Sequence, residues 1–466
     1  MGKAIVWFRN DLRLADNPAL AAALAAGHEP VPVYVHSPEE EGEWAPGAAS
    51  NAWRHRSLQG LQQSLRERGS DLVIRRGAAF DVLHALAKET GAEAIHWNRR
   101  HEPAVASRDA DLLAGLREAG LVVRTFRAGQ LSDPWDLLSG QGTPYKVFTP
   151  YWRALQPRLN LPPWSPAPAS LPPVDPHIVS LPLVALGLAP VVGWDAGFWK
   201  QQVPGEGGAH ETLDTFIEGA LQGYGEQRDL PDRTGTSLLS AHLHFGEIAP
   251  WTVIQRLRMA RTAANSTDID AWIRQLGWRE FASYTLHHFP DSAGTDLNVR
   301  FRRMRWNPPD AHFLAQWQQG RTGVPIVDAG LRQLWQTGWM HNRVRLIVGS
   351  WLTKHMRVHW LHGARWFWDT LIDADLANNT LGWQWVAGTG TDASPYFRIF
   401  NPVIQARKFD PHARYIAQWV PELRPLPPEA RFAPWEHGGA SGYPARPNVD
   451  LTKGRDAALA AWRRTR

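Results

Sequence analysis

The sequence has no cysteine, and it has no apolar run long enough to cross a lipid bilayer. Without cysteine there is no disulfide, no thiolate nucleophile, no Fe–S cluster and no cysteine-ligated zinc. The N-terminus lacks a basic segment followed by an apolar stretch and a small-residue cleavage site, so no secretory signal is expected. We expect a soluble, cytoplasmic protein without a membrane partner, and take a monomer as the expected state.

The turn after the first predicted strand lacks glycine. It reads RNDLR over residues 9–13, so the glycine-rich backbone that holds a dinucleotide pyrophosphate is missing. This argues against a Rossmann dehydrogenase. The motif GTGTD over residues 388–392 looks like a phosphate loop, but it follows no predicted strand.

A complete set of metal ligands is also missing. Asp373 and Asp375 lie two residues apart, but hard cations need many oxygen ligands and too few are close in the sequence. His355 and His359 have the spacing of zinc ligands on a helix, yet Met356 stands where a metalloprotease has its catalytic glutamate. We therefore predict no metal site.

The composition is that of a globular protein, and tryptophan is abundant. It has 466 residues, 44% of them hydrophobic and 20% charged, so two domains are expected. The net charge of +5 is compatible with a polyanionic partner, although many basic enzymes never bind DNA. The 25 tryptophans suit core packing, and they also suit stacking on flat ligands or carrying electrons.

The N-terminal part alternates β-rich runs with segments of helical spacing. The predicted strands are residues 4–8, 31–35, 72–75, 94–97 and 122–126, and helical patterns begin at Pro18, Asn51, Asp81 and Ala104. This alternation predicts an α/β domain over residues 1–130, with a doubly wound, five-stranded parallel sheet.

The composition changes after this domain. Prolines recur from Pro157 to Pro190, which disfavours both helix and sheet, so residues 131–205 are predicted to form an extended interdomain linker. From Glu211 onward strand signals almost vanish and amphipathic helical segments follow one another. An all-α C-terminal domain is predicted for residues 206–466.

Three local motifs could hold a ligand. Thr236, Ser237 and Ser240 lie where a loop meets a predicted helix start, where hydroxyls and free N–H groups can hold phosphate. From this segment alone, plain N-capping by Thr236 or Ser237 is the simpler interpretation.

The other two motifs lie on predicted helices. Gln275, Trp278 and Arg279 fall within one helical turn, which by itself is typical of a core helix with a charged edge. Asn342 and Arg343 suit hydrogen bonds to a flavin, a base edge or a phosphate, but equally a solvated basic face.

Several longer motifs occur in a fixed order: WFRNDLRLADN, TSLLS, WREF, GRTGVPIVDAGLRQL, GWMHNRVR, DADLANNTLGWQW and PYFRIFNP. Together they resemble the photolyase/cryptochrome family over nearly the whole chain. The resemblance is strongest to microbial cyclobutane pyrimidine dimer photolyases of the class I or class III type.

The resemblance implies an antenna-type α/β domain and a helical domain that holds FAD in a U shape and opens to DNA. The residues expected on the phosphate side of FAD are Tyr224, Thr236, Ser237, Leu238, Leu239 and Ser240. Those expected near the flavin ring and ribose are Trp272, Arg279, Asn342, Asp373 and Asp375. Asn379 matches the position that faces flavin N5; plant cryptochromes carry Asp there, so this residue favours a photolyase.

The resemblance also implies an electron path. Trp383, Trp360 and Trp306 match the tryptophan chain that passes an electron from the surface to photoexcited FAD. The match at Trp306 needs a one-residue shift. A purely packing role is the alternative for all three.

In the family's repair reaction, reduced FAD absorbs blue or near-UV light and passes an electron to a pyrimidine dimer that is flipped out of UV-damaged DNA. By the resemblance, Trp278 and Trp385 stack on the dimer, while Gln275 and Asn342 reach its polar edges. The residues expected to meet phosphates are Arg343, Arg398 and Lys408, extended by the cluster Arg300, Arg302, Arg303 and Arg305.

Two positions depart from this pattern. Cyclobutane-dimer photolyases carry Glu where this chain has Gln275, and Met beside the dimer where it has Leu346. Gln at the first position is typical of (6-4) photolyases, but those need His where this chain has Asn342. We therefore expect a deoxyribodipyrimidine photo-lyase, which is a carbon–carbon lyase. The alternative is that these two departures weaken or abolish its repair activity.

Two other functions compete with repair. The chain could be a blue-light receptor flavoprotein of the cryptochrome type, which photoreduces FAD and repairs little. A dark flavin oxidoreductase is the third possibility, but no nicotinamide site is evident. The resemblance also allows a second, antenna chromophore of the folate or deazaflavin type, a second flavin, or none, and HWNRRHEP over residues 96–103 does not decide among them.

Overall fold

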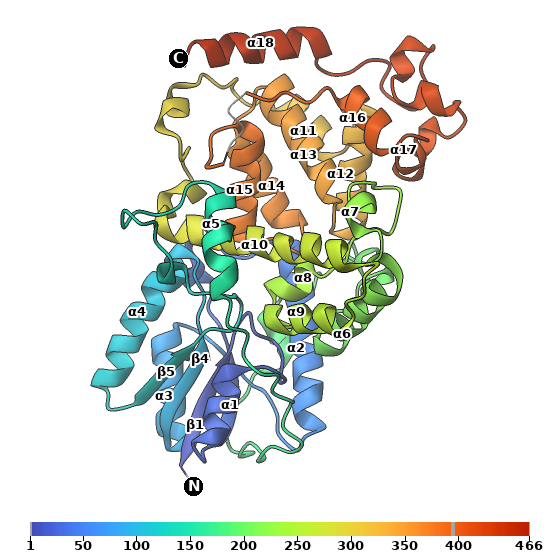
Figure 1. Cartoon of the computed structure of the whole chain (residues 1–466). Coiled ribbons are helices and arrows are strands. Elements are labelled where there is room, and N and C mark those ends of the chain that lie inside the picture. Colours follow the sequence, from blue (N-terminus) through green and yellow to red (C-terminus); the bar gives the residue numbers. More distant parts are fainter. Residues whose placement is uncertain (1, 393–396, 466) are drawn as a thin grey trace.

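The computed structural model describes residues 2–392 and 397–465. Figure 1 shows an α/β part that carries the N-terminus and a larger helical part that carries the C-terminus, with the two termini at opposite ends of the molecule.

The α/β part contains one sheet of five parallel strands in the order β3-β2-β1-β4-β5. The strands are β1 (Lys3–Phe8), β2 (Glu29–His36), β3 (Val73–Arg76), β4 (Ala92–Asn98) and β5 (Val122–Phe126). The predicted doubly wound parallel sheet is confirmed. Because β1 is covered on both faces, it is an almost continuous apolar run.

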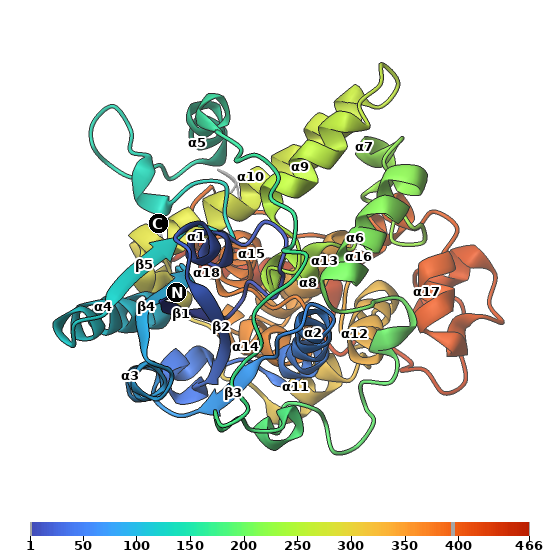
Figure 2. The same ribbon diagram turned by 90° about the horizontal axis from the view of Figure 1, so that it is seen from below.

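Four helices cover the sheet, two on each face, and Figure 2 shows their arrangement from below. They are α1 (Pro18–Ala25), α2 (Ala48–Arg66), α3 (Ala79–Thr90) and α4 (Pro103–Glu118). Alternate residues of β1 enter the two cores: Val6 and Phe8 pack with α1 and α2, and Ile5 and Trp7 pack with α3 and α4.

The connecting segment is not extended throughout. It contains α5 (Phe148–Leu155), whose apolar face packs on the helical part. Residues 159–205 contain only two short 3₁₀ turns, η4 (Leu183–Leu186) and η5 (Phe198–Lys200). The segment runs back along the α/β part, where the Leu171 and Leu181 amides donate to Arg68 O and Ile74 O at 2.7 and 2.9 Å. The domain limits proposed from the sequence stay a prediction.

The helical part contains no strand among its described residues, as predicted. Its helices are α6 (Glu206–Thr215), α7 (Tyr224–Gln227), α8 (Ser240–His244), α9 (Pro250–Met259), α10 (Ser266–His288), α11 (Ala311–Gln318), α12 (Pro325–Thr337), α13 (Asn342–Ser350), α14 (Trp360–Thr370), α15 (Leu376–Ala387), α16 (Pro402–Phe409), α17 (Arg414–Trp419) and α18 (Leu451–Arg463). None of the described helices is both long and apolar enough to span a membrane.

One local interpretation was wrong, and one spacing does not correspond to a single helix. Helix α8 begins at Ser240 with Leu239 at its N-cap and no side-chain cap, so neither Thr236 nor Ser237 caps it. His355 ends the π-helical turn η9 (Trp351–His355), whereas His359 caps α14, so the two histidines do not share a helix.

A buried carboxylate joins the two parts of the chain. Glu247 accepts hydrogen bonds from Trp53 Nε1 of α2 at 2.9 Å and from the Gly205 amide at 2.8 Å, and its second oxygen contacts His242 of α8. Since all of these groups lie inside the protein, they hold α8 at a fixed position against the α/β part.

Candidate functional site

Helices α7, α10 and α13 bring one group of predicted residues together. Gln275 of α10 accepts a hydrogen bond from Arg228 at 3.0 Å, and the Arg228 guanidinium lies over the Tyr224 ring at 5.3 Å. Asp229, the next residue, forms an ion pair with Arg343 of α13 at 2.7 Å. The residues predicted for cofactor, lesion and phosphate contacts therefore share one network.

The predicted phosphate contacts also gather around one ring. The Arg343 guanidinium lies 4.4 Å from the centre of the Phe409 ring, and Lys408 Nζ lies 5.1 Å from the same ring. Lys408 is exposed at the end of α16, whose last turn is basic. Arg343, whose charge is paired with Asp229, and Lys408 thus meet at one ring and form a basic surface next to Asn342.

A second group forms where α8, α10 and α15 meet. Asp375 is the N-cap of α15, where it accepts from the Asn378 amide at 2.8 Å, and it contacts His244 Nδ1 at 3.4 Å. Arg279 donates to the Leu243 carbonyl at 3.0 Å. Arg279, His244 and Asp375 line one cavity of about 60 Å³. Burial would raise the pKa of Asp375, but the hydrogen bond and charge of His244 and the charge of Arg279 hold it well below its usual range.

The sequence motifs did not reveal the partner of Asp373. Arg345 NH2 of α13 contacts both carboxylate oxygens of Asp373, at 2.8 and 3.1 Å, and its Nε donates to Met340 O. Arg345 lies in the motif GWMHNRVR beside two residues that were assigned roles. The sequence shows only that this arginine lies two positions after Arg343, another basic residue of the motif. Its contact with Asp373 becomes visible only in the fold.

The side-chain amide of Asn379 has a protein partner, in the described part of the chain, for its nitrogen but not for its oxygen. Its Nδ2 donates to the Ala364 carbonyl of α14 at 3.0 Å, so its Oδ1 is left to accept a hydrogen bond. Among the described residues, no donor contacts that oxygen. Asn342 is exposed at the first turn of α13, and Leu346 follows it one turn later on the same face.

Loop residues 236–239 lead into α8, which begins at Ser240. Leu238 has a φ of 55°, in the left-handed region that a leucine rarely adopts, and Leu239 is buried. This turn keeps the hydroxyl groups of Thr236, Ser237 and Ser240 at least partly accessible. Trp272 is buried against Phe216, with the ring centres 6.1 Å apart, so it belongs to the wall of this region.

The three predicted electron carriers all lie at or near α14 and the residues just before it. Trp383 lies against Gly363 of α14, where a Cβ would collide with the indole. Trp360 begins the same helix, and His359 lies between Trp360 and Trp306 with ring centres 5.5 and 5.2 Å away. Trp383 and Trp360 are buried, whereas Trp306 is partly exposed.

Trp385 and Arg398 meet at the other end of α15. Both line a small cavity of about 20 Å³ together with Lys354 and Phe400. Lys354 is fully buried, and its Nζ donates to Ala387 O at 2.6 Å, which holds the C-terminal end of the helix that carries Trp385. The first two residues of the motif PYFRIFNP lie outside the described residues.

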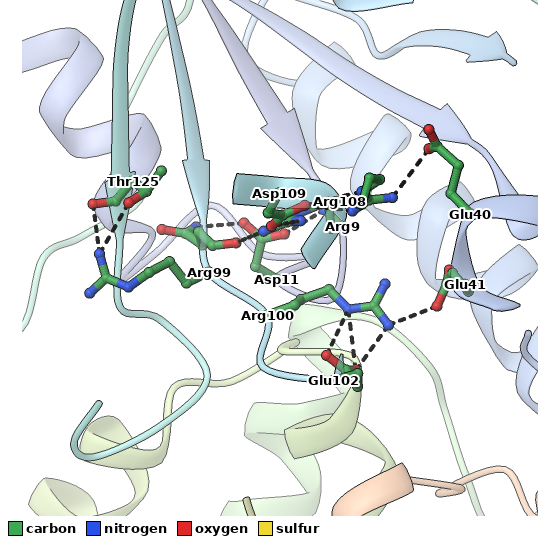
Figure 3. A network of polar contacts seen from close by, with 11 residues as sticks. Arg9, Asp11, Glu40, Glu41, Arg99, Arg100, Glu102, Arg108, Asp109 and Thr125 are labelled. Atoms are coloured by element: carbon green, nitrogen blue, oxygen red, sulfur yellow. Dashed lines mark hydrogen bonds and ion pairs between the residues drawn. The ribbon is translucent and has the colours of Figure 1, made fainter. Parts of the chain in front are cut away.

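A larger cavity of about 440 Å³ lies between the two parts of the chain. Trp44 and Trp368 line it, with ring centres 5.6 Å apart, and so do Arg54 and Arg302. Its polar wall includes Arg100, which pairs with Glu41 at 2.8 Å and with Glu102 at 2.9 Å (Figure 3). Burial would raise the pKa of Glu41, but the charge of Arg100 lowers it to about 2, so Glu41 is a carboxylate.

The carboxyl ends of β1 and β4, where a doubly wound sheet commonly binds a nucleotide, are filled by side chains. Arg9 pairs with Asp109 at 2.6 Å (Figure 3). It also contacts the Asn98 carbonyl, and its guanidinium lies over the Trp7 ring. Arg9 is 4% exposed. A ligand at this edge would have to displace a buried ion pair.

Comparison with known proteins identifies the family. A model of DNA photolyase matches residues 4–173, and a model of the FAD binding domain of DNA photolyase matches residues 272–464. A deoxyribodipyrimidine photo-lyase of Agrobacterium fabrum is 44% identical over 98% of this chain and 97% of its own. Cryptochrome-2 of Arabidopsis thaliana is 37% identical over 100% of this chain and 79% of its own. The chain belongs to the photolyase/cryptochrome family.

The fold agrees with this family. A crystal structure of a bacterial class III photolyase from Agrobacterium tumefaciens has a TM-score of 0.95 and 43% identity, covering 100% of this chain and 98% of that one. The match to the FAD binding domain includes Trp272, Arg279, Asn342, Asp373, Asp375 and Asn379. Tyr224 and residues 236–240 lie before the matched range.

The side chains present fit a flavin dinucleotide. A flavin edge offers both donors and acceptors, and the site offers both: the amides of Asn342 and Asn379, the carboxylate of Asp375 and the cation of Arg345. The Oδ1 of Asn379 is an open acceptor in this set, since Asn379 is partly exposed and no donor among the described residues contacts that oxygen. FAD is the cofactor of this domain type.

Proposed function

We propose that this protein is an FAD-dependent, light-driven lyase that splits cyclobutane pyrimidine dimers in DNA. The observation that carries the proposal is the network from Tyr224 through Arg228 to Gln275 and from Asp229 to Arg343. It joins residues proposed to touch the cofactor, the lesion and the phosphates within one site.

The residues have the following proposed roles. Bound FAD supplies the light absorption and the electron. Asp373 fixes Arg345, and Asn379, Asp375 and Arg279 hold the flavin. Trp278 and Trp385 stack on the flipped dimer, while the basic surface of Arg343 and Lys408 holds the neighbouring phosphates without reading sequence.

The test uses the FAD-loaded protein in its reduced state with an oligonucleotide that carries one thymine dimer. We expect light to restore the absorbance of the separated bases and expect no change in the dark. If the lesion survives illumination while the flavin still photoreduces, the proposal of repair is wrong.

A blue-light receptor is the second candidate, because Gln275 and Leu346 stand where repair enzymes carry Glu and Met, and because a plant cryptochrome matches the whole chain. A receptor would photoreduce through Trp383, Trp360 and Trp306 and leave lesions intact. Photoreduction without lesion loss in the test above is therefore its signature.

We also propose that the interdomain cavity binds a folate-type antenna chromophore. Its volume of about 440 Å³ lies within the usual range of about 300–1,000 Å³ for small-molecule sites. The carboxylates of Glu41 and Glu102 suit the amino-pyrimidine edge of a pterin, Trp44 and Trp368 suit its flat ring, and Arg302 suits the carboxylates of its tail. A flavin or deazaflavin at the sheet edge would instead require Arg9 to move.

Reconstitution distinguishes these pigments. We expect a reduced folate to bind and to transfer its excitation to FAD, and we expect Glu41→Gln to weaken that binding, while Glu118→Gln on the exposed side of α4 does not. Binding of a deazaflavin with no uptake of folate would show the assignment to be wrong.

A further inference from the structure

The two buried indoles of the proposed electron chain differ at their N–H groups. Trp360 Nε1 donates to Asp296 Oδ1 at 2.8 Å. Trp383 Nε1 is buried and has no hydrogen-bond partner among the described residues. Trp360 is 0% exposed and Asp296 is 5% exposed, so the carboxylate acts on the indole through protein rather than through water.

The loop that carries Asp296 is fastened to the helix that carries Trp383. Gln384, the residue after Trp383, donates from Nε2 to Ser292 O at 2.7 Å and to Thr295 O at 2.9 Å, and its Oε1 accepts from the Leu297 amide at 2.9 Å. These bonds fix the loop on both sides of Asp296. The carboxylate is therefore held in place before any charge appears on an indole.

An oxidised indole carries a positive charge that its neutral form lacks. A fixed negative charge in a poorly solvated site stabilises that cation far more than it does in water. Of these two indoles, only Trp360 donates its N–H to a carboxylate of the described residues. The positive charge is therefore more stable on Trp360 than on Trp383, so an electron moves favourably from Trp360 to oxidised Trp383.

We propose that Asp296 drives electron transfer from Trp360 to oxidised Trp383 by stabilising the Trp360 radical cation; this inference rests on the proposed electron chain. Bound FAD would supply the photo-oxidant that accepts one electron from Trp383; oxidised Trp383 then takes one electron from Trp360. No covalent bond forms or breaks, and the indole proton stays in its hydrogen bond to Asp296. Trp360 next takes one electron from Trp306, which a thiol or another one-electron donor in solution finally reduces.

The electron path from Trp306 to Trp360 passes the ring of His359, which is neutral. His359 Nδ1 accepts from the Leu361 amide at 3.2 Å, and burial lowers the pKa of His359 although the charge of Asp296 opposes this. Arg302 donates to the backbone carbonyl of Asp296 at 3.1 Å rather than to its carboxylate. The negative charge at Trp360 is thus neither opposed by a histidine cation nor paired with that arginine.

The experiment is transient absorption of the FAD-loaded protein with oxidised flavin, comparing wild type with Asp296→Asn. The amide keeps an acceptor for the indole N–H and removes only the charge. We expect the yield of the long-lived separated radical pair to fall at least about tenfold in D296N, equivalent to about 1.4 kcal/mol less driving force, with Asp296→Glu near wild type. The Trp360 indole N–H resonance, identified by its loss in W360F, checks without light that the hydrogen bond persists.

Asp310→Asn is the matched control, because Asp310 only caps the nearby helix α11 and asparagine is an equally good cap. It should leave the radical yield unchanged. A wild-type yield in D296N with the hydrogen bond intact would overturn the inference, since the pair would then serve only to satisfy a buried N–H. If instead wild type and W360F photoreduce equally, the proposed electron chain itself is wrong.

Discussion

The ring of Phe148 lies parallel to the indole of Trp278, with ring centres 3.7 Å apart and an interplanar angle of 10°. Phe148 comes from α5 in the connecting segment, whereas Trp278 comes from α10. The Arg274 guanidinium also lies over the Phe148 ring, at 4.9 Å. A buried side chain far away in sequence therefore fixes the plane of an indole that we propose stacks on the lesion.

Replacing Phe148 with leucine should weaken lesion binding selectively. Leucine keeps most of the buried volume but loses the parallel ring, and such aromatic pairs contribute about 0.5–1.5 kcal/mol beyond burial. We expect F148L to bind a dimer-containing oligonucleotide about threefold to tenfold more weakly, measured by fluorescence anisotropy, with little change for undamaged DNA. Phe432→Leu, at another buried phenylalanine, should leave both affinities unchanged. Equal losses for damaged and undamaged DNA would contradict this role.

The position of Gln275 predicts a gain of function. Its Oε1 accepts from Arg228 at 3.0 Å, so a glutamate there would be oriented by the same guanidinium. Gln275→Glu restores the acid that related repair enzymes use on the dimer, and we expect a several-fold higher quantum yield of dimer splitting. Gln275→Ala is the comparison and should repair less than wild type. Should Q275E repair no better than wild type, the missing acid does not limit this protein.

The fold was predictable from the sequence because its signals are local. Each predicted strand from residue 4 to residue 126 overlaps an observed one. The central strand β1 is an apolar run because it is covered on both faces, whereas the edge strands β3 and β5 carry arginines and are marked only by their β-branched residues. The contacts within the site could not be predicted from the sequence. Arg345 meets Asp373 and Phe148 meets Trp278 across 28 and 130 positions of sequence, and periodicity carries no information on such pairings. The absence of a side-chain cap on α8 could not be predicted either, because threonine and serine near a helix start commonly act as caps.

The ion pair of Arg345 with Asp373 should be needed for cofactor retention. Asp373→Asn leaves the Arg345 cation without its carboxylate partner beside the proposed flavin site, and removing one member of a largely buried pair is strongly destabilising locally. We expect at least about tenfold weaker FAD binding, measured as flavin fluorescence released on dilution. Glu422→Gln removes a similar ion pair to Arg332, at 2.7 Å, away from the site. FAD retention lost equally in E422Q would mean that the effect is general instability.

His341 makes the flavin site sensitive to acid. It is the N-cap of α13, where its Nδ1 accepts from the Arg343 amide at 3.2 Å. Burial lowers the pKa of His341 to about 4, with the charges of Arg343 and Arg345 adding to the effect and Asp229 opposing it. The folded state therefore prefers the neutral ring, and protonation would remove the cap from the helix that carries Asn342 and Arg345.

The sign of the pH dependence follows from the lowered pKa. In the unfolded chain histidine takes up a proton near pH 6.5, whereas in the folded protein it does so only near pH 4, so the stabilisation is complete above pH 6.5 and is lost as the pH falls towards 4. His341→Asn keeps a good cap without a titrating ring. Between pH 7 and pH 5 we expect the free energy of unfolding of wild type to fall by roughly 2 kcal/mol more than that of H341N, measured by urea denaturation. His437→Asn on the surface should follow wild type, and identical pH slopes for H341N and wild type would show that the ring of His341 is not held neutral by the fold.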